Sequence, residues 1–114
     1  MLKPAIIAGA LLCALTASAA AAETCKASWY QRGHTTANGE RFDPDGLTVA
    51  MRSYDFGGRY RITNLANGRS VVVRHNDYGP AKWTGKCIDL SRGAAREIGM
   101  IRAGVVRVRV EVVR

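Results

Sequence analysis

Hydrophobic and polar positions alternate with a period of two along several segments of the chain, as they do in half-buried β-strands. The clearest segment is 106–112, where valines alternate with charged residues. Residues 59–65 alternate in the same way, Asn67-Gly68 is a strong hairpin signal, and 70–75 is the expected returning strand. The pattern therefore predicts two strands joined by a tight turn and a further strand at the end of the chain.

Shorter segments complete the expected fold. Residues 25–30 and 47–51 are predicted as strands, and the segment 31–45, rich in Gly, Thr, Asn and Asp, as a long structured loop. One helix is predicted over 91–99, with a serine cap at its start and a glycine at its end. Five or six short strands and one small helix favour an all-β closed barrel, because closure leaves no exposed strand edge.

The first 22 residues have the pattern of an export signal. Lys3 precedes an apolar run over 5–15, and small residues follow, with Ala20 and Ala22 at the positions that a signal peptidase recognises. The run is shorter than the ~20 apolar residues of a spanning helix, so an uncleaved anchor is the weaker alternative. We predict a signal peptide over 1–22, one domain over 23–114, a periplasmic or secreted location and no stable membrane anchor.

Export also decides what the cysteines are expected to do. Cys13 leaves with the signal, whereas Cys25 and Cys87 remain and are predicted to form a disulfide in an oxidising compartment, with two free thiols as the alternative. A disulfide requires Cα atoms roughly 4.4–6.8 Å apart. The histidines, His34 and His75, form no close-spaced ligand pair with each other or with the cysteines, so neither a metal nor a cofactor is expected.

The chain is strongly basic. It has 17 Lys and Arg against 9 Asp and Glu, a formal net charge of +8 that becomes +7 if Lys3 is removed. In the cytoplasm this excess would indicate nucleic acid, but no aromatic-rich nucleic-acid motif accompanies it. Outside the membrane it suits peptidoglycan carboxylates or anionic lipid headgroups, and a generally soluble basic surface explains it equally well. We expect no nucleic-acid partner, and a monomer.

Four segments carry more information than composition does. They are 27–30 (Ala-Ser-Trp-Tyr), 36–43 (Thr-Ala-Asn-Gly-Glu-Arg-Phe-Asp), 73–80 (Val-Arg-His-Asn-Asp-Tyr-Gly-Pro) and 88–91 (Ile-Asp-Leu-Ser). In order and spacing they resemble the rare lipoprotein A (RlpA-like) family over nearly the whole predicted domain. The resemblance implies a six-stranded double-psi β-barrel with one or two short helices, similar to the barrels of expansins.

The same resemblance implies an activity. Characterised members of the family are septal lytic transglycosylases that prefer glycan strands stripped of stem peptides. The expected function is therefore an endolytic peptidoglycan transglycosylase that cleaves the MurNAc–GlcNAc bond and leaves 1,6-anhydro-MurNAc ends. Peptidoglycan glycan strands are the expected partner.

Breaking a glycosidic bond needs a proton for the leaving oxygen and stabilisation of a positive centre, which is why carboxylates recur in such sites. The family's two cleft carboxylates correspond to Glu40 and Asp77. Asp77 is our choice for the acid, because it is predicted to follow a strand directly and to precede Pro80 in a rigid turn. At least one of the two carboxyl groups should have a raised pKa. Without the resemblance, Asp77 would be an ordinary turn residue and Glu40 a solvated charge.

The remaining candidates follow from the same family positions. Asp43, Asn76 and Tyr78 are expected to bind substrate, and Asp89, at the predicted helix entry, is the reserve carboxylate. The family usually has His where this chain has Met51, and Arg where it has Tyr78; a methionine more often fills a core. The alternative function is therefore a non-catalytic, expansin-like peptidoglycan-binding module. An envelope assembly or inhibitor module that binds protein through its basic surface is a third.

Overall fold

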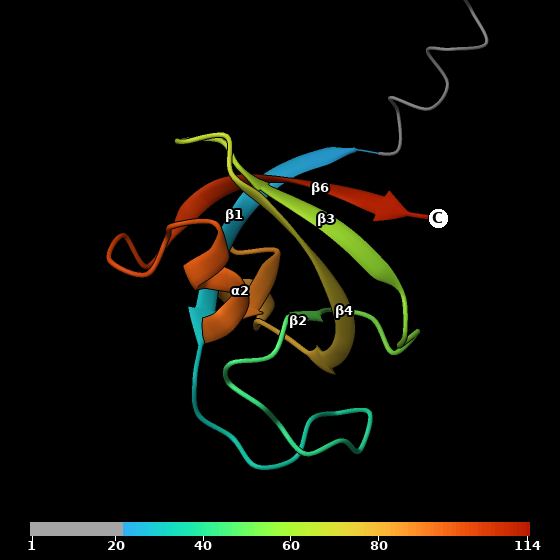
Figure 1. Cartoon of the computed structure of the whole chain (residues 1–114). Coiled ribbons are helices and arrows are strands. Elements are labelled where there is room, and N and C mark those ends of the chain that lie inside the picture. The colour runs from blue at the N-terminus through green and yellow to red at the C-terminus, as the bar shows by residue number, and fades with distance from the viewer. Residues whose placement is uncertain (1–21) are drawn as a thin grey trace, which may run out of the picture.

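The computed structural model describes residues 22–114, which form a closed barrel of six strands with one short α-helix packed against it (Figure 1). Residues 1–21 of the predicted signal peptide 1–22 lie outside the described residues. None of the helices in the described part is both long and apolar enough to cross a membrane. The elements are β1 (Glu23–Tyr30), β2 (Thr48–Met51), β3 (Arg59–Asn64), β4 (Ser70–Tyr78), η2 (Lys82–Thr84), β5 (Ile88–Ser91), α2 (Arg92–Glu97) and β6 (Val106–Val113).

The strands follow one another around the barrel in the order β1-β5-β2-β4-β3-β6. β1 with β5 and β2 with β4 are parallel pairs, and the other four pairs are antiparallel. Side chains that alternate along the strands fill the interior, among them Ile62, Ile88, Leu90 and Val108, all of them almost fully buried. The all-β closed barrel predicted from the alternating pattern is therefore confirmed.

The predicted hairpin is also confirmed. β3 and β4 pair in antiparallel register, and the turn between them is closed by hydrogen bonds to the Asn64 carbonyl from the amides of Asn67 and Gly68. Gly68 has a φ of 78°, in the left-handed region that a glycine adopts without strain. The strong local signal of Asn-Gly thus specified this turn correctly.

Two strand boundaries differ from the prediction. β4 continues to Tyr78 instead of ending at residue 75, so Asp77 lies within the strand and not in a turn after it. Residues 88–91 form β5, so Asp89 belongs to a strand and not to a helix entry. In both segments the outward side chains, such as Asp77 and Asp89, are polar but half-buried. The segments therefore lack the plain alternation of apolar and solvent-exposed polar residues from which a strand is predicted.

β4 owes part of its shape to an irregularity beside β2. Opposite the consecutive residues Val49 and Ala50 of β2 lie His75 and Asp77, so Asn76 is an extra residue on β4. Such bulges bend a strand and redirect its side chains. Here both His75 and Asn76 are buried, and Asp77 returns to the outer face.

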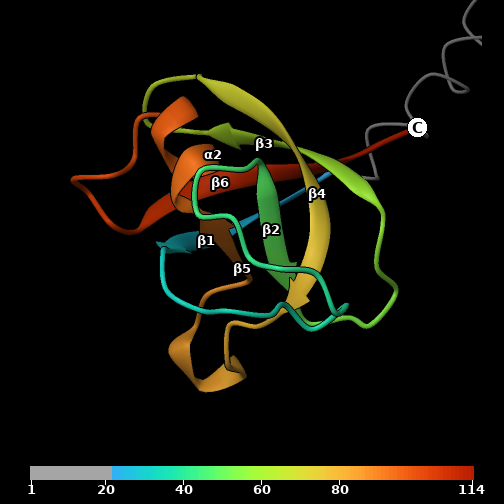
Figure 2. The same cartoon turned by 60° about the horizontal axis from the view of Figure 1, so that its bottom comes forward.

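The helix and the long loop fix each other. α2 begins after Ser91, whose hydroxyl accepts a hydrogen bond from the amide of Ala94 and donates one to the carbonyl of Gly46. A side chain at Gly93 would collide with the backbone of Asp45, so glycine permits the close approach. The loop over 31–47, anchored in this way, crosses in front of β2 and β4 (Figure 2).

The disulfide prediction is confirmed. Cys25 in β1 and Cys87, just before β5, are bonded, with their Cα atoms 6.0 Å apart. The bond joins residues 62 positions apart in the sequence, and so it ties together two neighbouring strands of the barrel wall. For a loop of this length the chain-entropy estimate of the stabilisation is about 4 kcal/mol.

Candidate active site

A row of four residues crosses the outer wall of the barrel on four neighbouring strands. Asp77 of β4 lies opposite Ala50 of β2, Ala50 lies opposite Asp89 of β5, and Asp89 lies opposite Ser28 of β1. Residues directly opposite one another share a face of a sheet, and adjacent strands are about 4.8 Å apart. The fold therefore places two carboxylates on one face, two strand spacings from each other, with only the small side chain of Ala50 between them.

Hydrogen bonds orient the carboxylate of Asp77 from three sides. The hydroxyl of Tyr30 donates to Oδ2 over 2.8 Å, and the backbone amides of Ala37 and Tyr78 each donate to Oδ1 over 2.9 Å. These donors come from β1, from the long loop and from β4 itself. A carboxylate held at this many points has a fixed direction, which is what a group that transfers a proton to a positioned bond needs.

Asp89 differs in its surroundings. Its carboxyl group is half-buried and accepts a hydrogen bond of 3.0 Å from the hydroxyl of Ser28. Burial raises the pKa of Asp89, and the negative charge of Asp77 adds to this increase, whereas the Ser28 hydrogen bond and the Lys86 charge oppose it. Burial, together with Asp77 and Asp89, likewise raises the pKa of Tyr30, which therefore stays a protonated donor.

Glu40 has the opposite electrostatic environment. Arg74 donates to both of its carboxylate oxygens, over 2.6 and 2.9 Å, and the side-chain amides of Asn38 and Asn76 donate over 2.9 and 3.1 Å. These contacts, led by those of Arg74, lower the pKa of Glu40 to about 2. The raised pKa expected of a general acid is thus not found at Glu40, because a paired guanidinium favours the ionised form.

The long loop brings Glu40 next to the strand that carries Asp77. The amide of Asn38 donates to the carbonyl of Asn76, and the side chain of Asn76 donates to Glu40, as described above. Within the loop, Thr36 is buried and its hydroxyl and amide groups bond Asn38 and Glu40. Glu40 is therefore bonded to Asn76, the residue before Asp77 in β4. The two carboxylates themselves have different hydrogen-bond donors.

The other predicted substrate residues, Asp43 and Tyr78, have no side-chain contact with the carboxylates of Asp77 and Asp89 among the described contacts. Asp43 is exposed, and among the described residues its carboxylate is seen to accept only from the amide of Asp45 in its own turn. Tyr78 is 43% exposed and stacks on Tyr54. Met51 packs against the core and lines a cavity of about 320 Å³ together with Ile88, so it contributes no ionisable group to the wall.

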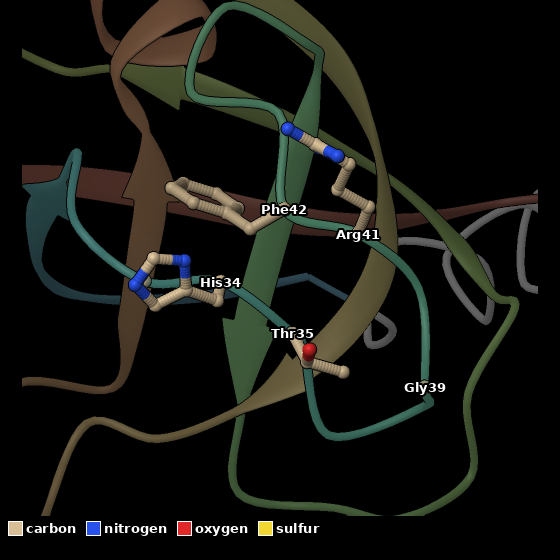
Figure 3. A pocket seen from close by; sticks show the side chains of 6 residues that line it. His34, Thr35, Gly39, Arg41 and Phe42 are labelled. Carbon is tan, nitrogen blue, oxygen red and sulfur yellow. The ribbon is translucent and has the colours of Figure 1, made fainter.

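A larger cavity, of about 420 Å³, lies on the long loop. It is lined by residues on both sides of the Thr35–Arg41 bridge, with His34 and Arg41 beside the ring of Phe42 (Figure 3). The cavity contains neither Asp77 nor Asp89, but Phe42 stacks on Tyr30 with ring centroids 4.7 Å apart, and Tyr30 bonds Asp77. The loop cavity thus adjoins the carboxylate row through two aromatic rings.

Sequence reasoning did not assign roles to Ser28 and Tyr30. Both belong to the Ala-Ser-Trp-Tyr segment, and as alternate residues of one strand they share a face. That spacing was a usable signal, but the strands that neighbour β1 were unknown. Among residues 22–114 there is no group of three or more His, Cys, Asp and Glu side chains that could hold a metal ion.

Residues 22–110 match the protein family described as lytic transglycolase. A protein from Nostoc sp. named "Probable endolytic peptidoglycan transglycosylase RlpA" is 57% identical over 91 residues, which are 75% of this chain and 24% of that protein. The "Endolytic peptidoglycan transglycosylase RlpA" of Vibrio cholerae is 45% identical over 94 residues, 80% of this chain and 35% of that protein. This chain thus spans about a quarter to a third of the length of these curated relatives.

Solved structures show the same fold at lower identity. The Streptomyces papain inhibitor aligns with a TM-score of 0.68 at 23% identity, covering 82% of this chain and 94% of the inhibitor. An expansin of Clavibacter michiganensis aligns with a TM-score of 0.63 at 23% identity, covering 82% of this chain and 50% of the expansin. At this identity the likeness concerns the barrel alone.

Proposed function

The chain belongs to the lytic transglycolase family, and from that premise we propose that it cleaves the glycan strands of peptidoglycan as an endolytic transglycosylase in the bacterial cell envelope. The observation that carries the proposal is the direction of the Asp77 carboxylate, which three donors fix on the outer wall beside Asp89. The names of the relatives support the substrate class, and the two carboxyl groups on the wall are the groups proposed to carry the reaction.

Asp77 is proposed as the acid and base of the reaction. In its protonated form it gives its proton to the glycosidic oxygen as the bond from that oxygen to the MurNAc anomeric carbon breaks. The 6-hydroxyl of the same MurNAc then attacks this carbon and returns a proton to Asp77, which leaves a 1,6-anhydro end and consumes no water. Such acid–base help is typically worth ~100- to 10,000-fold in rate.

Asp89 and Glu40 are proposed to support Asp77 in different ways. Asp89, whose pKa burial raises, holds a proton more readily than an exposed aspartate does, and its carboxyl group shares the wall face with Asp77. Glu40 remains ionised and holds Arg74 and Asn76, so it fixes the loop over β4 and places negative charge near the positive centre that develops. Tyr78 and Asp43 are proposed to contact sugar ring faces or hydroxyls, whereas Asn76, which is buried, is proposed to position Glu40 instead of touching the sugar.

The second candidate is a module that binds glycan without cutting it. It is favoured by Glu40, whose two oxygens are both occupied by Arg74, and by Met51, which places no ionisable side chain beside the row. In this case the same wall would hold the strand while no bond is broken. The two candidates differ in their products and not in their affinity for glycan.

Product analysis distinguishes them. Purified glycan strands, with and without stem peptides, are incubated with the protein over residues 23–114 and examined by mass spectrometry. New 1,6-anhydro-MurNAc ends are the expected result, formed faster on strands without stem peptides. New reducing ends would indicate a hydrolase, and unchanged strands that are still retained by the protein would indicate the binding module.

A further inference from the structure

Four ring side chains form a chain of contacts from the surface to the core at the end of β4. Tyr54 stacks on Tyr78, with ring centroids 4.4 Å apart and planes inclined by 14°. Tyr54 also meets Phe56 edge to face at 6.1 Å, and Phe56 lies 4.9 Å from the imidazole of His75. Because His75 is fully buried, the two tyrosines at the surface are supported by a fixed part of the barrel.

The tyrosine pair is unusually exposed for a stacked aromatic pair. Tyr54 is 72% exposed and Tyr78 43% exposed. Aromatic rings normally contribute to stability by burial, and a ring that is left in water gives up most of that contribution. Since each ring already holds the other in place, little side-chain entropy remains to be lost when a ligand covers the outer one.

One member of the pair, Tyr78, directly follows Asp77 at the end of β4. The amide of Tyr78 donates to the Asp77 carboxylate. The imidazole of His75, at the inner end of the ring chain, donates from Nε2 to the carbonyl of Asp77 over 3.0 Å. The aromatic contacts of His75 and Tyr78 and the orientation of Asp77 therefore all depend on the last four residues of β4, 75–78.

Two loops meet at this place. Gly57, in the loop that carries Tyr54, donates to the carbonyl of His75, and Asn38, in the long loop, donates to the carbonyl of Asn76. Figure 2 shows both loops at the end of the barrel where β4 finishes. A strand of sugars that crosses Asp77 would thus pass the long loop and the tyrosine pair.

We propose that Tyr54 and Tyr78 form a sugar-stacking subsite, in which the exposed ring of Tyr54 covers the apolar C–H face of a pyranose next to the bond at Asp77. The inference rests on the proposed function for the identity of the sugar strand. A neutral aromatic face suits a sugar ring and not a carboxylate, so the subsite selects the glycan backbone and is indifferent to the stem peptide. Tyr54 acts only in binding, because it touches none of the reacting atoms.

The test uses Tyr54→Ala, Tyr54→Phe and, as a matched control, Leu65→Ala. Leu65 is an exposed apolar residue at the opposite end of β4, in the turn after β3. With glycan strands as substrate, Tyr54→Ala should raise KM about tenfold and leave kcat nearly unchanged, since an aromatic contact contributes up to about that factor. Tyr54→Phe and Leu65→Ala should both behave like the unaltered protein.

Direct binding separates this inference from the proposed activity. The dissociation constant of a GlcNAc–MurNAc tetrasaccharide is measured by calorimetry for the same proteins. A weaker affinity in Tyr54→Ala alone supports the subsite even if the unaltered protein cuts no glycan. Equal affinities and equal KM values in Tyr54→Ala and Leu65→Ala would overturn it, as would a loss in Tyr54→Phe as large as that in Tyr54→Ala, which would assign the effect to the hydroxyl.

Discussion

The barrel wall and the long loop each carry a carboxyl group, and the pKa values of the two groups are shifted in opposite directions. On the wall, Asp89 is half-buried and has a raised pKa, with a hydroxyl as its hydrogen-bond partner. On the loop, Glu40 is more exposed and has its pKa lowered to about 2 by Arg74 and two amides. The same functional group thus holds a proton more readily than usual in one region and less readily than usual in the other.

The difference teaches how the two regions divide the work. Burial raises the pKa of a carboxyl group, and a facing guanidinium lowers it. Asp77 lies between the regions, since it shares the wall face with Asp89 and follows Asn76, which bonds Glu40. We therefore propose that proton transfer belongs to the wall, and that Glu40 serves by its charge and by the loop geometry that it maintains.

The largest expected effect comes from Asp77. Asp77→Asn keeps the shape of the side chain but removes the proton that is transferred, so cleavage should fall by ~100- to 10,000-fold. Glycan binding and the melting temperature should change little. The rate of formation of anhydro ends measures the effect, and Glu97→Gln is the control because Glu97 is an exposed carboxylate at the end of α2 and is not among the candidate site residues. A loss below about tenfold would remove Asp77 from the chemistry.

A smaller effect is expected at the loop. Glu40→Gln leaves Arg74 as an uncompensated positive charge and loosens Asn76, so cleavage should fall by up to about 100-fold through misplacement of the site. The double change Glu40→Gln with Arg74→Gln should recover part of this loss, because it removes the unpaired charge. Double-mutant analysis of kcat/KM measures the coupling. A loss at Glu40 that exceeds the loss at Asp77 would reverse the assignment of the two regions.

The smallest effect concerns stability and has opposite signs in the two regions. A raised pKa in the folded state destabilises the protein wherever the group is ionised, so Asp89→Asn should raise the melting temperature by a few degrees at pH 7, and less as the pH falls toward the raised pKa. Glu40→Gln should lower the melting temperature slightly at pH 7, because a lowered pKa stabilises above the ordinary value of 4.5 and this gain is lost between 4.5 and about 2. Thermal unfolding over pH 2–7 would show both signs. Equal signs would contradict the comparison.

The outline of this fold was predictable from sequence because its strands are half-buried. Residues 106–112 and the Asn67-Gly68 turn show the period and the turn chemistry directly, and the cysteine pair followed from the expected export. β5 and the end of β4 were not predicted from the residues, since their outward side chains are the polar residues of the site. The function of a region thus obscured its local pattern.

The candidate site was predictable only in part. The family resemblance identified Asp77 and Glu40 as residues of interest, but not that Arg74 would hold Glu40 ionised, since that contact joins residues 34 positions apart. Asp89 was named only as a reserve, and its place beside Asp77 depends on β2 lying between β4 and β5. Strand order is a property of the whole chain, so no local segment contained this information.

The central claim, that the wall and not the loop holds the proton, is tested most directly by a ¹³C NMR titration of the side-chain carboxyl carbons of Asp89 and Glu40 in the folded protein. The account predicts that the pKa of Asp89 lies above that of an ordinary aspartate, and that Glu40 titrates near 2, with Arg74→Gln returning Glu40 toward 4.5. If Glu40 instead titrates above Asp89 in the unaltered protein, the loop is the proton-holding region and the claim is contradicted.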